Sequence, residues 1–128
     1  MADRKVAIIA ANGGLDAAYK VFNIATAAAS MGSGVSVFFT FEGLKLIHKQ
    51  AYGALAAPAS MEGVKTEGLP TIPELVGMAQ EMGVQFIACQ MTMDLMSIEQ
   101  EHLVEGIEVG GAASFLAAAF DADVTLTF

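Results

Sequence analysis

Cysteine and basic side chains are scarce in this chain, and each scarcity excludes a class of protein. The 128 residues include a single cysteine, Cys89, so an intramolecular disulfide is impossible. No CxxC or Cys/His spacing typical of a zinc site is present. Lys and Arg number 6 against 14 Asp and Glu, giving a formal charge of −8. This charge repels a phosphate backbone, so we do not expect nucleic-acid binding.

Long apolar runs are also few. The run after the N-terminal Met-Ala-Asp-Arg-Lys is too short for the core of a signal peptide, and a cytoplasmic location is the default expectation. The 21 residues from Val21 to Phe41 carry no charge and are long enough to span a bilayer. Polar residues and two glycines, Gly32 and Gly34, interrupt the segment. A helix, a turn and a strand explain it better, and we expect no membrane span.

What the chain does have is an excess of apolar residues, at 55% of the total. Its length fits one domain, residues 1–128, and leaves little room for a second. A single chain of this size cannot hide so much apolar surface, so we expect a homo-oligomer with apolar contacts.

Short apolar runs alternate with helical patterns along the chain. Strands are expected at residues 5–11, 35–41, 84–89 and 124–128, with a shorter one within 105–109, and helices at 16–31, 42–49, 71–82, 90–98 and 111–120. This alternation predicts a single-domain α/β fold with a parallel sheet between helices. Residues 50–70 hold the glycines and prolines of a long loop, which we expect to be partly mobile and able to cover a site.

The helix near residue 71 has the clearest start. Thr71 and Glu74 have the spacing of a capping box, and Pro73 suits a first turn. The helical period predicts a buried stripe of Leu75, Met78, Ala79 and Met82.

Sites in open α/β sheets gather where the strands end at their carboxyl ends. Three such ends carry candidate loops, at residues 12–14, 40–43 and 89–92. Cys89 is the strongest candidate, because it ends a strand and precedes a helix whose N–H groups would favour a nucleophilic thiolate. The alternative is a buried core cysteine, a common place for a free thiol.

Several cysteine enzymes do not fit this sequence. A cysteine phosphatase or a rhodanese-type loop needs cationic residues after its cysteine, and none occurs from Gln90 to Met96. A papain-like hydrolase needs a partner histidine, and no spacing couples His48 or His102 to Cys89. A peroxidatic cysteine typically follows Pro and Thr or Ser, and residues 83–88 contain neither.

Two further patterns have a structural and a functional interpretation. The Asn12-Gly13-Gly14 turn could present N–H groups to an anion, but it matches no nucleotide-binding motif and suits an ordinary strand-to-helix turn. A loose acidic run follows Cys89 and consists of Asp94, Glu99, Glu101, Glu105 and Glu108. A solvated face explains this run better than a metal site, and we expect neither a metal nor a cofactor.

Three segments resemble the DsrE/DsrF-like family, in particular its stand-alone DsrE-like branch, which is sometimes labelled peroxiredoxin-like. They are FFTFEGLKLI (38–47), ACQMTMDLM (88–96) and VEGIEVGGAASFL (104–116). The resemblance implies a mainly parallel five-stranded sheet between helices and a trimer or hexamer. It also implies a sulfur relay, in which Cys89 matches the cysteine that carries sulfur as a persulfide.

These considerations give one leading hypothesis and two alternatives. The leading one is a sulfur carrier or sulfurtransferase that holds sulfane sulfur on Cys89 and passes it to a thiol of a partner protein. The first alternative is an oligomeric protein that binds a small ligand or serves assembly, with Cys89 in its core. The second is a one-cysteine thiol peroxidase.

Overall fold

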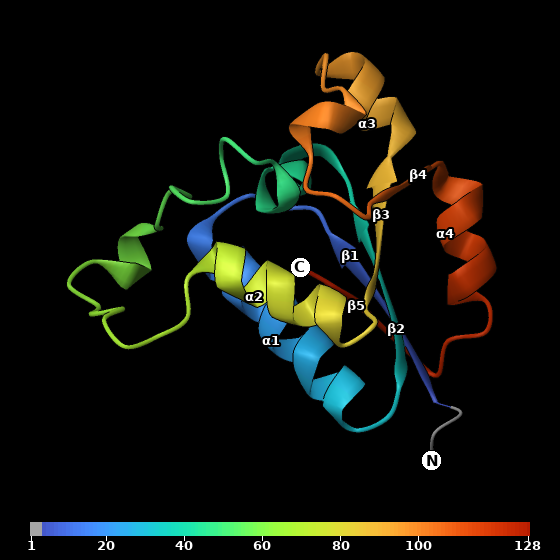
Figure 1. Cartoon of the computed structure of the whole chain (residues 1–128), viewed down its shortest axis with the longest axis horizontal. Helices are drawn as coiled ribbons and strands as arrows, with labels where there is room; N and C mark the ends of the chain where they lie inside the picture. The colour runs from blue at the N-terminus through green and yellow to red at the C-terminus, as the bar shows by residue number, and fades with distance from the viewer. Residues whose placement is uncertain (1–3) are drawn as a thin grey trace.

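The computed structural model describes residues 4–128, which form a five-stranded sheet with helices on both faces (Figure 1). The strands are β1 (Lys5–Ala10), β2 (Gly34–Phe39), β3 (Gln85–Cys89), β4 (Glu108–Gly110) and β5 (Val124–Thr127). Their order in the sheet is β4-β3-β2-β1-β5, and every neighbouring pair is parallel. The α/β class and the layered parallel sheet predicted from the sequence are confirmed.

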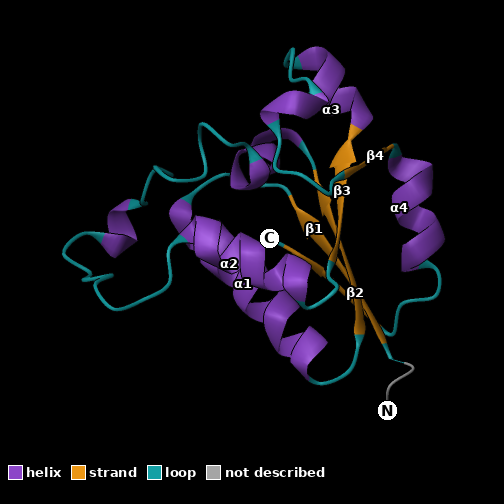
Figure 2. Cartoon of the chain, viewed as in Figure 1, coloured by secondary structure: helices purple, strands orange, loops and turns teal. Residues whose placement is uncertain are grey.

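The helices are divided unequally between the two faces of the sheet (Figure 2). Helices α1 (Leu15–Ser30) and α2 (Ile72–Glu81) lie together on one face, and α4 (Ala112–Ala119) lies on the other. The short helix α3 (Gln90–Leu95) continues directly from the end of β3. Within residues 4–128 there are also three 3₁₀ helices: η1 (Phe41–Ile47), η2 (Ala59–Met61) and η3 (Gln100–His102).

The main core lies between the sheet and the α1–α2 layer. Three buried aromatic rings meet there, with centroid distances of 6.2 Å for Phe22–Phe39, 5.9 Å for Phe22–Phe86 and 5.2 Å for Phe39–Phe86. Each ring stabilises the fold by about 1.5–3 kcal/mol through burial. This core fixes strands β2 and β3 side by side, and their carboxyl ends carry the candidate site.

The opposite face has a smaller core. Phe115 of α4 stacks on Phe38 at 5.1 Å, and Ala7, Ile87 and Cys89 complete the cluster. Side chains two residues apart on a strand share a face, so Cys89 points to the same side of the sheet as Ile87.

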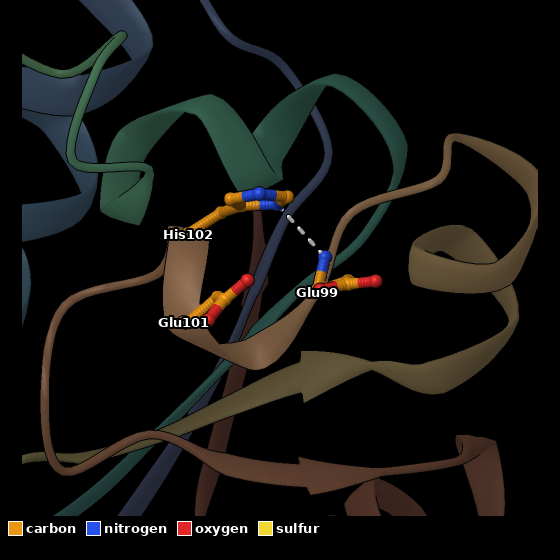
Figure 3. Close-up of side chains that lie close together, drawn as sticks. All are labelled: Glu99, Glu101 and His102. Carbon is orange, nitrogen blue, oxygen red and sulfur yellow. Dashed lines mark hydrogen bonds between the residues drawn. The ribbon is translucent and has the colours of Figure 1, made fainter.

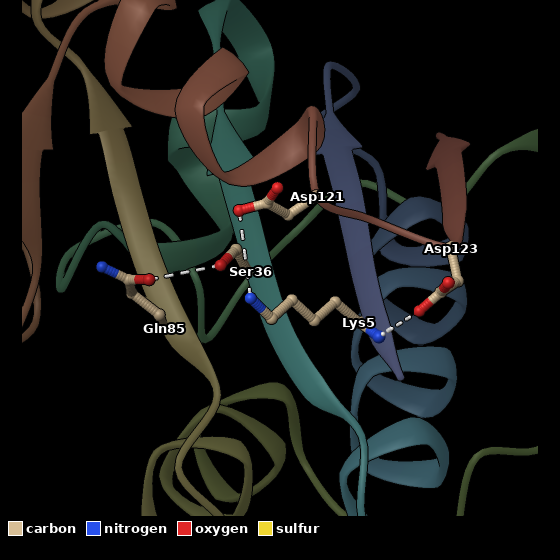
Figure 4. Close-up of polar contacts among 5 residues, drawn as sticks. All are labelled: Lys5, Ser36, Gln85, Asp121 and Asp123. Atoms are coloured by element: carbon tan, nitrogen blue, oxygen red, sulfur yellow. Dashed lines mark hydrogen bonds and ion pairs between the residues drawn. The ribbon is translucent and has the colours of Figure 1, made fainter. Parts of the chain in front are cut away.

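The same face becomes polar toward the amino-terminal edge of the sheet (Figure 4). The Ser36 hydroxyl donates to the side-chain oxygen of Gln85 at 3.2 Å. The backbone N–H of Lys5 donates to Asp123 at 2.9 Å, and its ammonium lies 4.0 Å from Asp121. Polar side chains suit this half of the face because they remain in contact with water.

Helix α2 begins as the sequence predicts, but its buried face differs. The Thr71 hydroxyl accepts from the N–H of Glu74 at 3.2 Å, and the Glu74 carboxylate accepts from the N–H of Thr71 at 3.1 Å, which confirms the capping box. The predicted stripe is wrong for Met78 and Met82, which are 44% and 40% exposed. The buried residues are Ile72, Leu75, Val76 and Ala79. The observed stripe has the same helical spacing as the predicted one, but it lies on the side of the helix that carries the β-branched residues Ile72 and Val76.

Residues 41–47 form a 3₁₀ helix, where we expected an ordinary helix over 42–49. The tight turn brings Gly43 onto the end of β1, where an added Cβ would lie 1.8 Å from the carbonyl oxygen of Ala10. Phe41 begins the turn with a φ of 49°, in the left-handed region.

The uncharged stretch Val21–Phe41 divides into part of α1, a turn and strand β2, as predicted. Gly32 has a φ of 86° in the turn, a conformation that glycine adopts without strain. Among residues 4–128, no helix has the length and apolar character needed to cross a membrane.

Candidate functional site

The three strand ends singled out in the sequence meet at the carboxyl edge of the sheet. The turn after β1 packs on the turn after β2, since a Cβ on Gly13 would lie 2.5 Å from the carbonyl oxygen of Glu42. The turn after β2 contacts α3, where the hydroxyl oxygens of Thr40 and Thr92 are 3.3 Å apart. The edge is therefore one continuous surface built from all three loops.

Cys89 is the last residue of β3 and immediately precedes α3. Its side chain is 4% exposed and packs with Phe38, Ile87 and Phe115 under α4. The thiol is thus at the predicted strand end, but it is buried in the isolated chain. The core interpretation of Cys89 remains compatible with this burial.

The polar groups around Cys89 distinguish it from an ordinary core cysteine. Burial raises the pKa of the Cys89 thiol, as for any charge moved out of water. The hydroxyl and N–H of Thr92, the hydroxyl of Thr40 and the N–H of Met91 lower this pKa by hydrogen bonding. These groups outweigh burial, so the pKa of Cys89 lies below its ordinary value. The arrangement favours a thiolate at the sheet edge.

The hydroxyl protons of Thr40 and Thr92 can be assigned by counting hydrogen-bond donors and acceptors. Thr92 is 0% exposed, and its hydroxyl oxygen accepts from the N–H of Phe41 at 3.0 Å. Thr40 and Thr92 each carry one hydroxyl proton, and one of these protons is used in the bond between them. Whichever threonine donates in that bond, the hydroxyl proton of the other is free to point at the sulfur of Cys89. The pair therefore forms a short hydrogen-bond chain that can end on the thiolate.

Sequence reasoning identified Cys89 but missed Thr40 and Thr92 as part of its surroundings. A signal was present, because Thr40 ends the neighbouring strand and Thr92 follows Cys89 by one turn of helix. Only the register that pairs Phe39 with Ala88 places these hydroxyls beside the same sulfur.

The Asn12-Gly13-Gly14 turn serves packing at this edge. Gly14 precedes α1, and a Cβ there would lie 2.7 Å from a carboxylate oxygen of Asp16. The first N–H of the helix, on Leu15, already donates to the carbonyl of Ala56 at 2.9 Å. A carboxylate beside the helix start repels an anion, so the structure favours the ordinary turn.

The two histidines lie together rather than with Cys89. The rings of His48 and His102 stack with centroids 5.8 Å apart. Burial and the neighbouring His102 lower the pKa of His48 below 6.5. The groups that shift the pKa of Cys89 include neither ring. The papain-like arrangement therefore gains no support.

One cluster within residues 4–128 has the composition of a metal site, formed by Glu99, Glu101 and His102 (Figure 3). A ligand atom from each lies within 4.8 Å of the others. Nδ1 of His102, however, accepts the backbone N–H of Glu99 at 3.0 Å, so the other ring nitrogen carries the proton of the neutral imidazole. No ring nitrogen is left with a free lone pair, and both carboxylates are exposed. The cluster is therefore not preformed for a metal ion.

Together, the fold and the site define a small α/β protein with a buried thiol of lowered pKa at the carboxyl edge of a parallel sheet. The model of the DsrE/DsrF/DrsH-like family matches residues 2–61 and 52–127. The chain belongs to this family, which confirms the resemblance seen in the sequence.

Relatives and solved structures agree with this assignment. The chain is 35% identical over 158 aligned residues to sulfur carrier protein DsrE2 of Allochromatium vinosum, covering 98% of this chain and 99% of the relative. It is 28% identical to the uncharacterized protein YrkE of Bacillus subtilis, covering 96% of each. The crystal structure of YchN from E. coli superposes with a TM-score of 0.73 at 18% identity, covering 98% of this chain and 99% of that one. At this low identity, the structural match establishes the fold alone.

Proposed function

We propose that this protein is a sulfur carrier whose Cys89 thiolate holds sulfane sulfur as a persulfide and passes it to a thiol of a partner protein. The observation that carries the proposal is the position of Cys89 beside the paired hydroxyls of Thr40 and Thr92 and the N–H groups in the first turn of α3, which together lower its pKa. An apolar core would raise the pKa of a cysteine, whereas these groups lower that of Cys89. The relative from Allochromatium vinosum is named as a sulfur carrier, which supports a role of this chain in carrying sulfur.

The proposed cycle has two exchange steps. In the loading step, the Cys89 thiolate attacks the terminal sulfur of a polysulfide, and the shortened polysulfide leaves with the electron pair of the broken S–S bond. In the transfer step, a partner thiolate attacks the outer sulfur of the persulfide. A bond forms between these two sulfurs, the bond to Sγ of Cys89 breaks, and Sγ leaves as a thiolate. Neither step needs an external oxidant or reductant.

Departure of Sγ as a thiolate explains why the hydrogen-bond donors matter. A leaving thiol departs faster when its pKa is low. The groups around Cys89 stabilise the anion both when it attacks and when it leaves. Because Cys89 is 4% exposed, both steps also require the chain to open locally around the thiol.

The burial of Cys89 supports a second candidate function. In this alternative, the thiol is a core group and the protein serves ligand binding or assembly without sulfur chemistry. The family relationship is compatible with both functions, and only the reactivity of Cys89 separates them.

We further propose that the protein is a homo-oligomer in which a second copy covers α4. Helix α4 carries no charged residue. Leu116 in this helix is 45% exposed, and Phe120, the residue directly after the helix, is 80% exposed. A helix that is apolar on all sides is normally buried. A copy of the same chain is the partner that every molecule in solution has available.

Intact mass spectrometry tests the sulfur-carrier function. The protein is incubated with polysulfide, freed of excess reagent, and measured before and after reduction, beside Cys89→Ser. We expect a gain of one sulfur atom that reduction removes and that the variant lacks. A wild-type mass that stays unchanged with polysulfide would favour the binding protein.

A further inference from the structure

Exposed apolar side chains surround the Cys89 edge of the sheet. Phe41, Met91, Leu95 and Met96 are 48%, 58%, 66% and 40% exposed. They come from η1, α3 and the residue after α3, all next to the threonines that contact Cys89. Large apolar groups gathered beside a reactive group are typical of a surface that another protein covers.

This apolar surface includes a pocket of about 230 Å³ between η1 and the chain after α3. Phe41, Leu44, Lys45, His48, Ala51, Met96 and Ile98 line it. Its volume is below the ~300–1,000 Å³ of small-molecule sites and suits a single apolar side chain.

The pocket is joined to the surroundings of Cys89 through Thr92. The N–H of Phe41 donates to the Thr92 hydroxyl at 3.0 Å, and the N–H of Met96 donates to the Thr92 carbonyl at 2.9 Å. A side chain bound in the pocket would therefore contact Phe41 and Met96, and both of these residues are hydrogen-bonded to Thr92, which lies beside the Cys89 sulfur.

The charges around the pocket are mainly negative, and Lys49 is the cation that flanks the lining residue His48. Lys45, the one lysine in its lining, is paired with Glu42 at 2.6 Å. Burial and His102 lower the pKa of His48, which keeps this ring neutral near pH 7. Exposed carboxylates flank the lining residues along the chain: Glu42, Asp94, Glu99 and Glu101.

The wider sequence strengthens this asymmetry. After Lys65 the chain contains ten Asp and Glu residues and no Lys or Arg. All of β3, α3, η3 and β4 fall in this part. Near this edge the chain itself supplies Lys45 of η1, which is paired with Glu42, and the exposed Lys49 after it, so further cationic groups must come from another molecule.

We propose that the protein exchanging sulfur with Cys89 docks on this apolar surface. It would insert an apolar side chain into the pocket and place Lys or Arg against the acidic rim, which consists of Glu42, Asp94, Glu99 and Glu101. The occupant is a cationic, apolar segment that carries the exchanging thiol. The proposal rests on the sulfur-carrier function and adds to it the chemistry by which the partner is recognised. Charge complementarity would speed the encounter, and the pocket would fix the register of the two sulfurs.

Matched peptides test the proposal. The basic probe is Lys-Leu-Cys-Leu-Lys, the acidic probe is Glu-Leu-Cys-Leu-Glu, and the polar probe is Lys-Ser-Cys-Ser-Lys. Transfer of sulfur from polysulfide-loaded protein to each peptide is followed by mass spectrometry. Each rate is divided by that peptide's rate with the neutral disulfide dithiodipyridine, which corrects for differences in thiol pKa. We expect the basic probe to react at least about tenfold faster than the acidic one at low salt, with the ratio falling as salt rises.

Variants then locate the effect. Asp94→Lys/Glu101→Lys reverses two rim charges and should remove the preference for the basic probe. Glu67→Lys/Glu81→Lys makes the same change in net charge at exposed positions away from this edge and should preserve it. Ala51→Leu fills the pocket and should bring the basic probe down to the rate of the polar one. Circular dichroism and loading with polysulfide are measured for every variant to verify folding and an intact thiol.

The outcomes separate docking from chemistry. Equal corrected rates for the basic and acidic probes, or equal losses in the rim and control variants, would overturn the docking surface while the carrier function stands. If wild-type Cys89 does not load, the carrier function fails. In that case, fluorescence anisotropy with labelled probes that carry Ser for Cys decides the docking surface. Tighter binding of the basic probe, weakened by Ala51→Leu, supports the surface, and equal binding of the two charged probes overturns it.

Discussion

The hydroxyl of Thr92 provides the most direct test of the thiolate site. Thr92→Val keeps the shape of the side chain and removes the oxygen that links Thr40, the N–H of Phe41 and Cys89. Because Thr92 is 0% exposed, no water can take the place of that oxygen without a change in packing. We expect the pKa of Cys89 to rise in the variant, because the Thr92 hydroxyl is lost and the Thr40 hydroxyl, although its proton is then free, loses the partner that holds it beside the sulfur.

The size of the effect on reactivity follows from hydrogen-bond energies. A hydrogen bond to a charged group contributes roughly 1.5–3 kcal/mol. A thiolate of higher pKa is also a better nucleophile, with a Brønsted coefficient of about 0.4–0.5, which offsets about half of that loss. Roughly 0.8–1.5 kcal/mol remains, corresponding to a fall of about 4- to 13-fold in the rate of thiolate reactions below the pKa.

The assay is alkylation of Cys89 by iodoacetamide across a range of pH, followed by intact mass. Thr92→Ser retains a hydroxyl and should keep a rate within about twofold of the wild-type rate, apart from a small packing cost. A Thr92→Val protein that is folded and has the wild-type pH midpoint would refute the hydrogen-bond chain. Urea unfolding of both variants accounts for the lost acceptor of the Phe41 N–H, which costs about 1–3 kcal/mol.

Three further predictions concern packing, pH and assembly. Gly43→Ala should lower the free energy of unfolding by about 3 kcal/mol, because its Cβ meets backbone, whereas Gly77→Ala, with open space in α2, should raise it by about 0.5–1 kcal/mol in the same urea titration. The lowered pKa of His48 means that stability falls as pH drops through 6.5, because the unfolded chain takes up that proton more readily. His102→Gln should raise the NMR-measured pKa of His48, yet leave it below 6.5 because burial, the larger cause, persists. Phe120→Glu should reduce the mass found by sedimentation while preserving the circular dichroism spectrum, and an unchanged mass would contradict assembly through α4.

The fold could be predicted from the sequence because its signals are local. Four of the five strands are apolar or β-branched runs bounded by turn residues, and a parallel sheet explains their lack of alternation. The buried side of α2 could not be chosen in the same way. Leu75 and Ala79 fit two stripes of equal spacing, one with the apolar residue Met78 and the other with the apolar residue Val76. Only packing against α1 and the sheet decides between the two stripes.

The site was predictable in its position but incomplete in its parts. Cys89 stands at a strand end, which a single sequence can reveal. Thr40 precedes Cys89 by 49 positions in the chain. Its contact with Thr92 depends on β2 and β3 being neighbours in the sheet. The geometry of η1 could not be predicted either. Residues 41–47 form a 3₁₀ helix rather than the expected α-helix, and the close approach of Gly43 to the end of β1 is a long-range contact that a local pattern does not reveal.

The burial of Cys89 and its lowered pKa bear on different measurable quantities, and this separates the two candidate functions. Burial limits access, so it lowers the rate of alkylation at every pH, including the plateau where the thiol is fully ionised. Hydrogen bonding from Thr92 and Thr40 acts on ionisation, so it moves the pH at which the rate reaches half of that plateau. Slow alkylation alone therefore does not identify a core cysteine. A low plateau with a midpoint below that of a free cysteine describes a thiolate awaiting local opening, whereas a low plateau with a raised midpoint describes a thiol held in the core.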